Sequence, residues 1–219
     1  MKIMLLGAPG SGKGTQGEKL SQAMGIPRLS TGDMLRAEVQ AQTPIGLEIA
    51  ALMPTGQLIG DEIVIGLIKQ RVNQADCANG YILDGFPRTL HQAQTAVEAG
   101  ILIDTLLELT VDDEAIITRM AGRRLHPASG RTYHVALNPP RVADIDDLSG
   151  EPLITRPDDE ASVVRERLEI YRAQTLPLLN YFQSLAIGLR PRIMTVNGEG
   201  EVDAVAATVR QVLGSQAPI

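Results

Sequence analysis

The chain has 219 residues, of which 44% are hydrophobic and 21% charged, a composition typical of a globular protein with one main domain and insertions. Its formal net charge of −6 argues against general binding to nucleic acids or anionic membranes, because both require a basic surface. The single cysteine, Cys77, excludes an intramolecular disulfide, and no apolar run is long enough to cross a bilayer. The N-terminus is typical of a core strand rather than a signal peptide. A cytoplasmic protein is therefore expected.

Apolar strand-like runs alternate with segments of helical periodicity, which predicts an α/β fold with a parallel sheet covered by helices on both faces. The predicted strands are residues 2–6, 81–83, 105–111 and 193–196. The predicted helices are residues 13–24, 61–72, 90–98, 113–121 and 201–213. Residues 160–186 are predicted to form one long amphipathic helix that Pro177 kinks or splits, and residues 215–219 a frayed tail.

Two stretches interrupt this alternation. Residues 30–59, the first insertion, combine predicted short helices over 33–40 and 45–53 with proline and glycine punctuation, which indicates a small helical unit. Residues 122–159, which we call the lid, contain five prolines and a predicted short strand over 131–135, which indicates a small β-rich flap. The remaining segments, 1–29, 60–121 and 160–219, are expected to form the core. Both insertions are candidates for mobile covers over a site in that core.

The first predicted strand runs directly into the sequence GAPGSGKGT over residues 7–15. Such a strand, glycine loop and helix turn several backbone N–H groups toward one point, where the helix dipole also favours an anion, and Lys13 adds a positive charge. The spacing of GxxxxGK therefore predicts a phosphate site. Gly14 stands where a hydroxyl is usual and Thr15 comes one residue late, so Thr15 is a weak candidate for direct Mg²⁺ ligation. The alternative, a glycine-rich turn without a ligand, is disfavoured by the strand and helix around it.

A second group of polar residues follows the predicted strand 81–83. Asp84 lies at a carboxyl strand end, where ligands of open α/β sheets collect, and it is predicted to hold Mg²⁺ through water. The alternative is an aspartate that merely caps a turn, which we would favour if the glycine loop were absent. Arg88 follows near the same edge, although a single arginine is usually an ordinary surface residue.

Several arginines stand at the boundaries of the two insertions. Arg119 and Arg123 are four residues apart and are predicted to share one face of the helix that leads into the lid. Arg156 and Arg167 follow the far end of the lid, and Arg36 belongs to the first insertion. Because planar guanidinium groups suit phosphate oxygens, arginines at these positions predict a clamp that closes on phosphates.

Three segments of this chain resemble the adenylate kinase family: GAPGSGKGT at 7–15, LSTGDMLR at 29–36 and DGFPRT at 84–89. The lid sequence from Gly122 to His134 resembles the long-lid bacterial form, and the resemblance covers nearly the whole chain. It implies a P-loop fold and reversible phosphoryl transfer from MgATP to AMP, giving two ADP, with Mg²⁺ as the cofactor. No long apolar stripe demands a protein partner, so a monomer is expected.

The resemblance also implies roles for individual residues. Those expected to take part in catalysis are Lys13, Arg88, Arg123, Arg156 and Arg167. Those expected to bind ATP are Gly10, Ser11, Gly12, Lys13, Gly14, Thr15, Arg119, Arg123, Tyr133, His134 and Gly200. Those expected to bind AMP are Thr31, Arg36, Gln57, Leu58, Ile59, Gly85, Arg88, Gln92, Arg156 and Arg167. A glutamine amide can pair with adenine through two hydrogen bonds, which supports the role of Gln92, although by itself it would read as a surface residue.

The lid departs from relatives that hold a structural zinc ion through two pairs of cysteine-type ligands. The matching positions here are His126, Ser129, Asp146 and Ser149. Zinc prefers thiolate and imidazole ligands, and only His126 is either, so we predict a metal-free lid held by hydrogen bonds.

Three other functions compete with this reading. A kinase for UMP, CMP or GMP is disfavoured by the long lid and by Thr31 and Gln92. A P-loop GTPase is disfavoured because the sequence lacks the Asn-Lys-x-Asp run that reads guanine. A module that binds ATP without turnover is disfavoured because Lys13, Asp84 and the arginines occur together.

Overall fold

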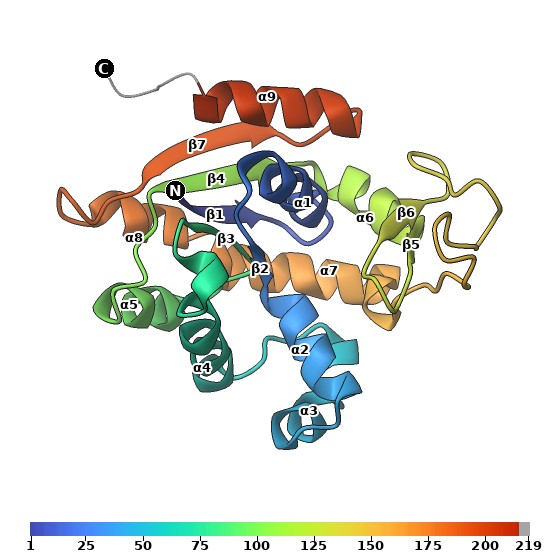
Figure 1. The fold of residues 1–219 in the computed structure, drawn as a ribbon, viewed down its shortest axis with the longest axis horizontal. Coiled ribbons are helices and arrows are strands. Elements are labelled where there is room, and N and C mark those ends of the chain that lie inside the picture. The colour runs from blue at the N-terminus through green and yellow to red at the C-terminus, as the bar shows by residue number, and fades with distance from the viewer. Residues whose placement is uncertain (215–219) are drawn as a thin grey trace.

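The computed structural model describes residues 1–214, and its centre is a parallel sheet of five strands in the order β2-β3-β1-β4-β7 (Figure 1). The strands are β1 (Lys2–Gly7), β2 (Arg28–Ser30), β3 (Tyr81–Asp84), β4 (Thr105–Thr110) and β7 (Arg192–Asn197). The register pairs Leu5 of β1 with Asp84 of β3, and Gly7 of β1 with Leu109 of β4. The loops after β1 and β3 therefore leave the same carboxyl edge of the sheet, and the predicted α/β class is confirmed.

Helices cover both faces of this sheet because the side chains of β1 alternate between two cores. Ile3 and Leu5 pack in the cluster that contains buried residues of α1 (Lys13–Met24) and α9 (Val202–Gly214). Met4 and Leu6 pack in the cluster that contains buried residues of α4 (Asp61–Val72), α5 (Leu90–Glu98) and α8 (Leu178–Ser184). A third cluster joins α6 (Asp113–Ala121) to α7 (Ala161–Ile170) beside the glycine loop.

The helical periodicity placed α1, α4, α5 and α6 at the observed bounds and α9 within one residue. The prediction that residues 160–186 form a long helix that Pro177 kinks or splits is confirmed in outline. The segment divides into α7, a π-helical turn (Tyr171–Thr175) and α8, and Pro177 immediately precedes α8. Pro177 has no N–H to donate to the helical hydrogen-bond ladder. Just before it, Leu176 N donates to Tyr171 O at 2.8 Å, which is the wider spacing of a π turn.

Strand β2 was missed by the sequence patterns. Its three residues are too few to show alternation, and it exists because Leu29 pairs with Leu83 of β3. The predicted tail at 215–219 lies outside the described residues. None of the helices in residues 1–214 is long and apolar enough to cross a membrane.

The first insertion contains α2 (Thr31–Gln40), α3 (Pro44–Ile49) and the 3₁₀ turn η1 (Met53–Thr55), which broadly confirms the two predicted helices. Ser30 caps α2, since Asp33 N donates to Ser30 Oγ at 3.2 Å, and Thr43 caps α3 in the same way. In Figure 1, α2 and α3 extend below the sheet, while the lid extends to its right.

The lid contains two short antiparallel strands, β5 (Arg123–Leu125) and β6 (Thr132–His134), with long connecting loops and the 3₁₀ turn η3 (Pro157–Asp159). The predicted strand over 131–135 is confirmed as β6. The prediction that Arg119 and Arg123 share a helix face was wrong, because α6 ends at Ala121 and Arg123 lies in β5 opposite His134. The division into core, first insertion and lid remains a prediction.

Candidate active site

The glycine loop between β1 and α1 is tightly curled. Gly10 and Gly12 have φ angles of 83° and 94°, the left-handed region that side chains disfavour. A Cβ on Gly10 would also lie 2.9 Å from Met120 Cγ, whereas one on Gly12 would meet no atom within 4 Å. Ser11 N donates to Ala8 O at 3.1 Å and closes the turn. The loop can therefore lie against α6 only with glycine at position 10.

Lys13 begins α1 and directs its ammonium group back over the loop. Its Nζ donates to the carbonyl oxygens of Gly7 and Ala8 at 2.6 and 2.7 Å. Burial lowers the pKa of Lys13 to about 7; Asp84 raises it, and the charges of Arg88, Arg167 and Arg123 lower it further. Lys13 therefore stands in a cationic environment that an anionic ligand would neutralise.

Asp84 lies at the end of β3 and is 8% exposed. Arg28 Nη1 donates to Asp84 Oδ2 at 2.7 Å, and Arg28 Nη2 donates to Asp33 Oδ2 at 2.9 Å. A Cβ on Gly14 would lie 3.6 Å from Asp84 Oδ2, so the start of α1 adjoins this carboxylate. Arg28 was not among the predicted site residues, because it belongs to the unpredicted strand β2.

The donor set around Asp84 fits Mg²⁺ better than a tightly ligated transition metal. The structure brings no group of three or more His, Cys, Asp or Glu together as a metal site anywhere in residues 1–214. Mg²⁺ keeps most of its water ligands and takes only one or two carboxylates, so a single aspartate beside a phosphate loop suffices. Thr15, the other candidate, is exposed on the first turn of α1.

Several arginines from different elements repel one another at this edge of the sheet. Burial lowers the pKa of Arg88 to about 10, with a further contribution from the charge of Arg167. Burial also lowers the pKa of Arg156 to about 10, with contributions from Arg36 and Arg123. Such mutual repulsion is unfavourable in the protein alone and favours an anionic ligand of high charge.

Two of these arginines are held by carboxylates of η3. Arg123 Nε donates to Asp159 Oδ2 at 2.7 Å, and its Nη2 donates to the other carboxylate oxygen. Arg167 Nη1 donates to Asp158 Oδ2 at 2.7 Å and to the Asp158 carbonyl at 3.0 Å. The sequence carried no signal that Asp158 and Asp159 pair with the clamp arginines.

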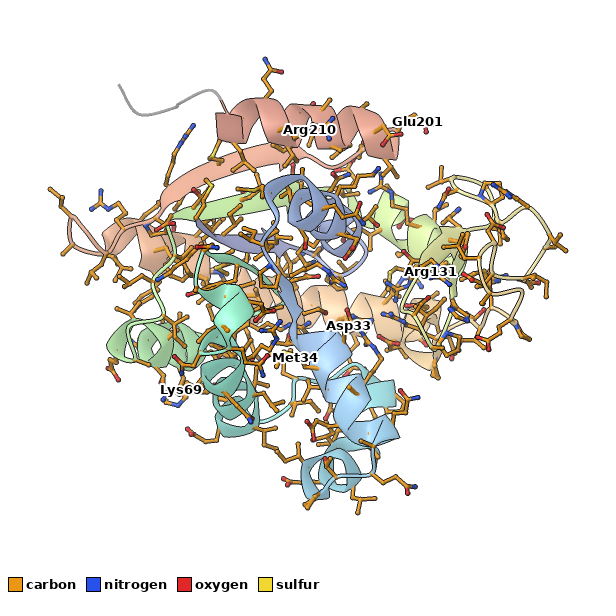
Figure 2. The ribbon with its side chains drawn as sticks, in the orientation of Figure 1. Asp33, Met34, Lys69, Arg131, Glu201 and Arg210 are labelled. Atoms are coloured by element: carbon orange, nitrogen blue, oxygen red, sulfur yellow. The ribbon has the colours of Figure 1, made fainter. Side chains whose placement is uncertain are left out.

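Residues of the first insertion, the core and the edge of the lid line a cleft that is open to solvent. Nine of the ten residues expected to bind AMP line it: Thr31, Arg36, Gln57, Leu58, Ile59, Gly85, Arg88, Gln92 and Arg167. Arg156, the tenth, instead lies 4.0 Å from Asp33. Figure 2 shows Asp33 at the end of α2 that is nearest the core. Met53, Gly56 and Asp158 also line the cleft and were not predicted to do so.

Gly85 joins the two sides of this cleft. Thr31 Oγ1 and Arg88 Nε both donate to the Gly85 carbonyl, at 2.8 and 2.9 Å. Gly85 has a φ of 82°, and a Cβ there would lie 2.7 Å from Arg88 Nη2. Glycine is therefore required for Arg88 and the first residue of α2 to approach each other. Gln92 is 2% exposed, so the alternative of a surface glutamine is wrong.

The remaining residues expected to bind ATP lie in the lid, on α6 and after β7. Tyr133 Oη donates to Asp146 Oδ1 at 3.0 Å. Burial lowers the pKa of His134, and the neighbouring charges of Arg119 and Arg124 lower it further. A Cβ on Gly198 would lie 3.0 Å from Ser11 O, so the turn that contains Gly200 adjoins the glycine loop. Their contact with a nucleotide remains a prediction.

The four positions that match the zinc ligands of relatives are hydrogen-bonded to one another. His126 approaches Ser129 Oγ at 2.6 Å through Nδ1 and Ser149 Oγ at 3.2 Å through Nε2. Ser149 Oγ donates to Asp146 Oδ2 at 2.8 Å. Arg131 binds the same carboxylate and holds the pKa of Asp146 below its usual range. Figure 2 places Arg131 within the lid.

One comparison with known proteins bears on this site. The family model described as adenylate kinase matches residues 5–187. That range contains the glycine loop, Asp84, both insertions and every arginine of the clamp, and it ends before β7.

Proposed function

Since this chain belongs to the adenylate kinase family and has its activity, phosphoryl transfer between adenine nucleotides, we propose that it transfers a phosphoryl group reversibly from MgATP to AMP and yields two ADP. The observation that carries this proposal is the convergence of Arg88, Arg123 and Arg167 on the charge of Lys13, between the glycine loop and the cleft. Two phosphate-bearing ligands that meet there would neutralise this repulsion. The cellular role would be the balance of adenine nucleotides.

The donor nucleotide belongs at the glycine loop. The backbone N–H groups from Gly10 to Thr15 open α1, and the positive end of its dipole favours the phosphates of ATP there. Lys13 Nζ would exchange its carbonyl partners for phosphate oxygens. Arg119, Tyr133, His134 and the main chain near Gly200 would cover the base and ribose.

The acceptor nucleotide belongs in the cleft between the first insertion and α5. Arg36 and Arg88 would bind the phosphate of AMP, because both line the cleft. Gln92 would pair with adenine, and the segment Gln57 to Ile59 would close over the base. Arg156 would reach the same phosphate from the lid edge.

The transfer needs alignment and neutralisation of charge rather than covalent help from the protein. An oxygen of the AMP phosphate forms the new bond to the γ-phosphorus of ATP, and the bond from that phosphorus to the β–γ bridging oxygen breaks. Lys13 and the clamp arginines would stabilise the charge on the phosphoryl oxygens in transit. Mg²⁺, which Asp84 would hold through water, neutralises charge on the ATP phosphates when it is bound.

Both covers serve to exclude water, the competing acceptor. In this reading Gly122 and the Asp158-Asp159 edge act as the lid hinge. Arg123 and Arg167 would leave their carboxylate partners for the phosphates as the lid closes, so the full clamp would form only with both nucleotides present. The lid would be of the long bacterial type. The protein would be cytoplasmic and a monomer, and light scattering in solution tests its oligomeric state.

A coupled assay with ATP and each nucleoside monophosphate in turn tests the reaction. ADP should form fastest with AMP, and failure to form ADP from AMP would refute the proposal. Arg123→Ala should lower kcat at least about 100-fold, because one lost donor to the transferring group has an effect of that size. An unchanged kcat would remove Arg123 from the mechanism.

A further inference from the structure

Gln92 is held by partners on both sides of its amide. Its Oε1 accepts from Arg88 N at 2.8 Å, and its Nε2 donates to Asp61 Oδ1 at 2.7 Å. A backbone N–H only donates and a carboxylate only accepts, so these partners permit one orientation of the amide. With the amide turned over, Oε1 would face the carboxylate and Nε2 would face the N–H.

Asp61 is itself fixed in place. It lies in the first turn of α4, and its second oxygen, Oδ2, accepts from Thr89 Oγ1 at 2.7 Å. Thr89 caps α5 by accepting from Gln92 N at 3.1 Å. The Asp61 carboxylate therefore bridges the starts of α4 and α5. It contacts the side chain of Gln92 directly, and it contacts Thr89, which caps the backbone N–H of Gln92. Because Gln92 is 2% exposed, water has little access to compete for these bonds.

We propose that Asp61 is a positioning residue that makes the acceptor site select adenine over guanine, by locking the orientation of the Gln92 amide. This inference rests on the proposed function, in which the cleft that Gln92 lines receives a nucleoside monophosphate. Each atom of the locked amide has bonding capacity left: Oε1 has a second lone pair and Nε2 a second hydrogen. Oε1 therefore accepts from the N6 amino group of adenine, and Nε2 donates to an adjacent ring nitrogen.

Guanine has an acceptor, O6, where adenine has the N6 donor. Against the locked amide, O6 would face Oε1, an acceptor opposite an acceptor. Binding guanine well requires the amide to turn over, which Asp61 and Arg88 N oppose. An asparagine at position 61 can accept or donate a hydrogen bond, so it no longer opposes the turned-over orientation of the Gln92 amide. Only Arg88 N then still opposes that orientation.

The test compares Asp61→Asn with Glu62→Gln in the full-length protein. Glu62 is the next residue of the same helix turn and contacts His91 rather than Gln92, so its variant loses the same charge at the same place. Titration calorimetry gives the Kd of AMP and of GMP, and the coupled assay gives kcat/KM for both. We expect the preference for AMP over GMP to fall about tenfold in Asp61→Asn, the effect of one hydrogen bond to a charged group, and to stay unchanged in Glu62→Gln.

A purely structural Asp61 would lower the melting temperature and affect both nucleotides equally, so an unchanged AMP to GMP ratio in Asp61→Asn overturns the inference. Asp61→Ala provides a second variant, with a loss of preference in the same direction. In a Gln92→Ala background Asp61→Asn should have no further effect on the ratio, and an undiminished effect there would also refute the lock. Absence of turnover with AMP in the unmodified protein would refute the proposed function, while the ratio of the two Kd values would still decide the role of Asp61.

Discussion

The pair between Arg123 and Asp159 should stabilise the base of the lid, because it joins β5 at the start of the lid to η3 at its end. Asp159 has a side chain that is 0% exposed, and it accepts two hydrogen bonds from an arginine that is 22% exposed. Asp159→Asn keeps the size of the side chain, removes the charge and places an NH₂ group against one of the guanidinium donors. One charge-assisted bond is lost, and Arg123 keeps a positive charge without its counterion.

Breaking a buried ion pair by changing one partner costs about 3–5 kcal/mol. Arg123 still reaches water with part of its side chain, and asparagine still accepts one bond, so we expect about 2–3 kcal/mol here. For a chain of this length each kcal/mol shifts Tm by about 2–4 °C, which predicts a decrease of about 4–12 °C.

The assay is thermal unfolding followed by circular dichroism at pH 7. Asp144→Asn is the matched control, because Asp144 lies in the same lid and accepts one bond from Arg124 at 2.9 Å, but its side chain is 64% exposed. An exposed pair contributes about 0–1 kcal/mol, so this variant should lose no more than a few degrees. If the two variants melt together, the reasoning from burial is refuted. In Arg123→Ala, Asp159→Asn should cost less than in the native chain, since their shared bond is already absent.

Further predictions concern the glycine loop, two glycines and the lid. Because the pKa of Lys13 is about 7, the amine is mostly neutral at pH 8, and the phosphates of bound ATP should raise that pKa. ATP binding at pH 8 should therefore take up close to one proton, which calorimetry in buffers of different ionisation enthalpy measures. Lys13→Met should abolish this proton uptake. Gly66→Ala, inside α4 with no atom within 4 Å of the new Cβ, should raise the free energy of unfolding by about 0.5–1 kcal/mol. Gly46→Ala should lower it by at least about 3 kcal/mol in urea titrations, because its Cβ would lie 2.0 Å from Glu38 O. Equilibration with Zn²⁺ and desalting should leave no bound zinc, and one retained atom per chain would contradict the metal-free lid.

Local sequence patterns determined most helices and strands of the core. Helical periodicity and capping residues such as Ser30 and Thr89 depend on neighbours three or four positions away, so they can be read along the chain. The phosphate loop was equally readable, since the conformation of Gly10 and the charge of Lys13 belong to one short segment. Most of the cleft residues were predicted only from the family resemblance, because side chains such as those of Gln57, Leu58 and Ile59 have no chemistry that marks them as ligands.

Tertiary structure alone decided which polar side chains meet. Arg28 reaches Asp84 across 56 positions of sequence, Arg123 reaches Asp159 across 36, and Gln92 reaches Asp61 across 31. A bond of 2.7 Å depends on where packing places two distant backbones, and no local period encodes that distance. The residue types and their order therefore predicted a phosphate-binding α/β protein, while the packing of its strands and insertions determined which carboxylate restrains each arginine and the glutamine.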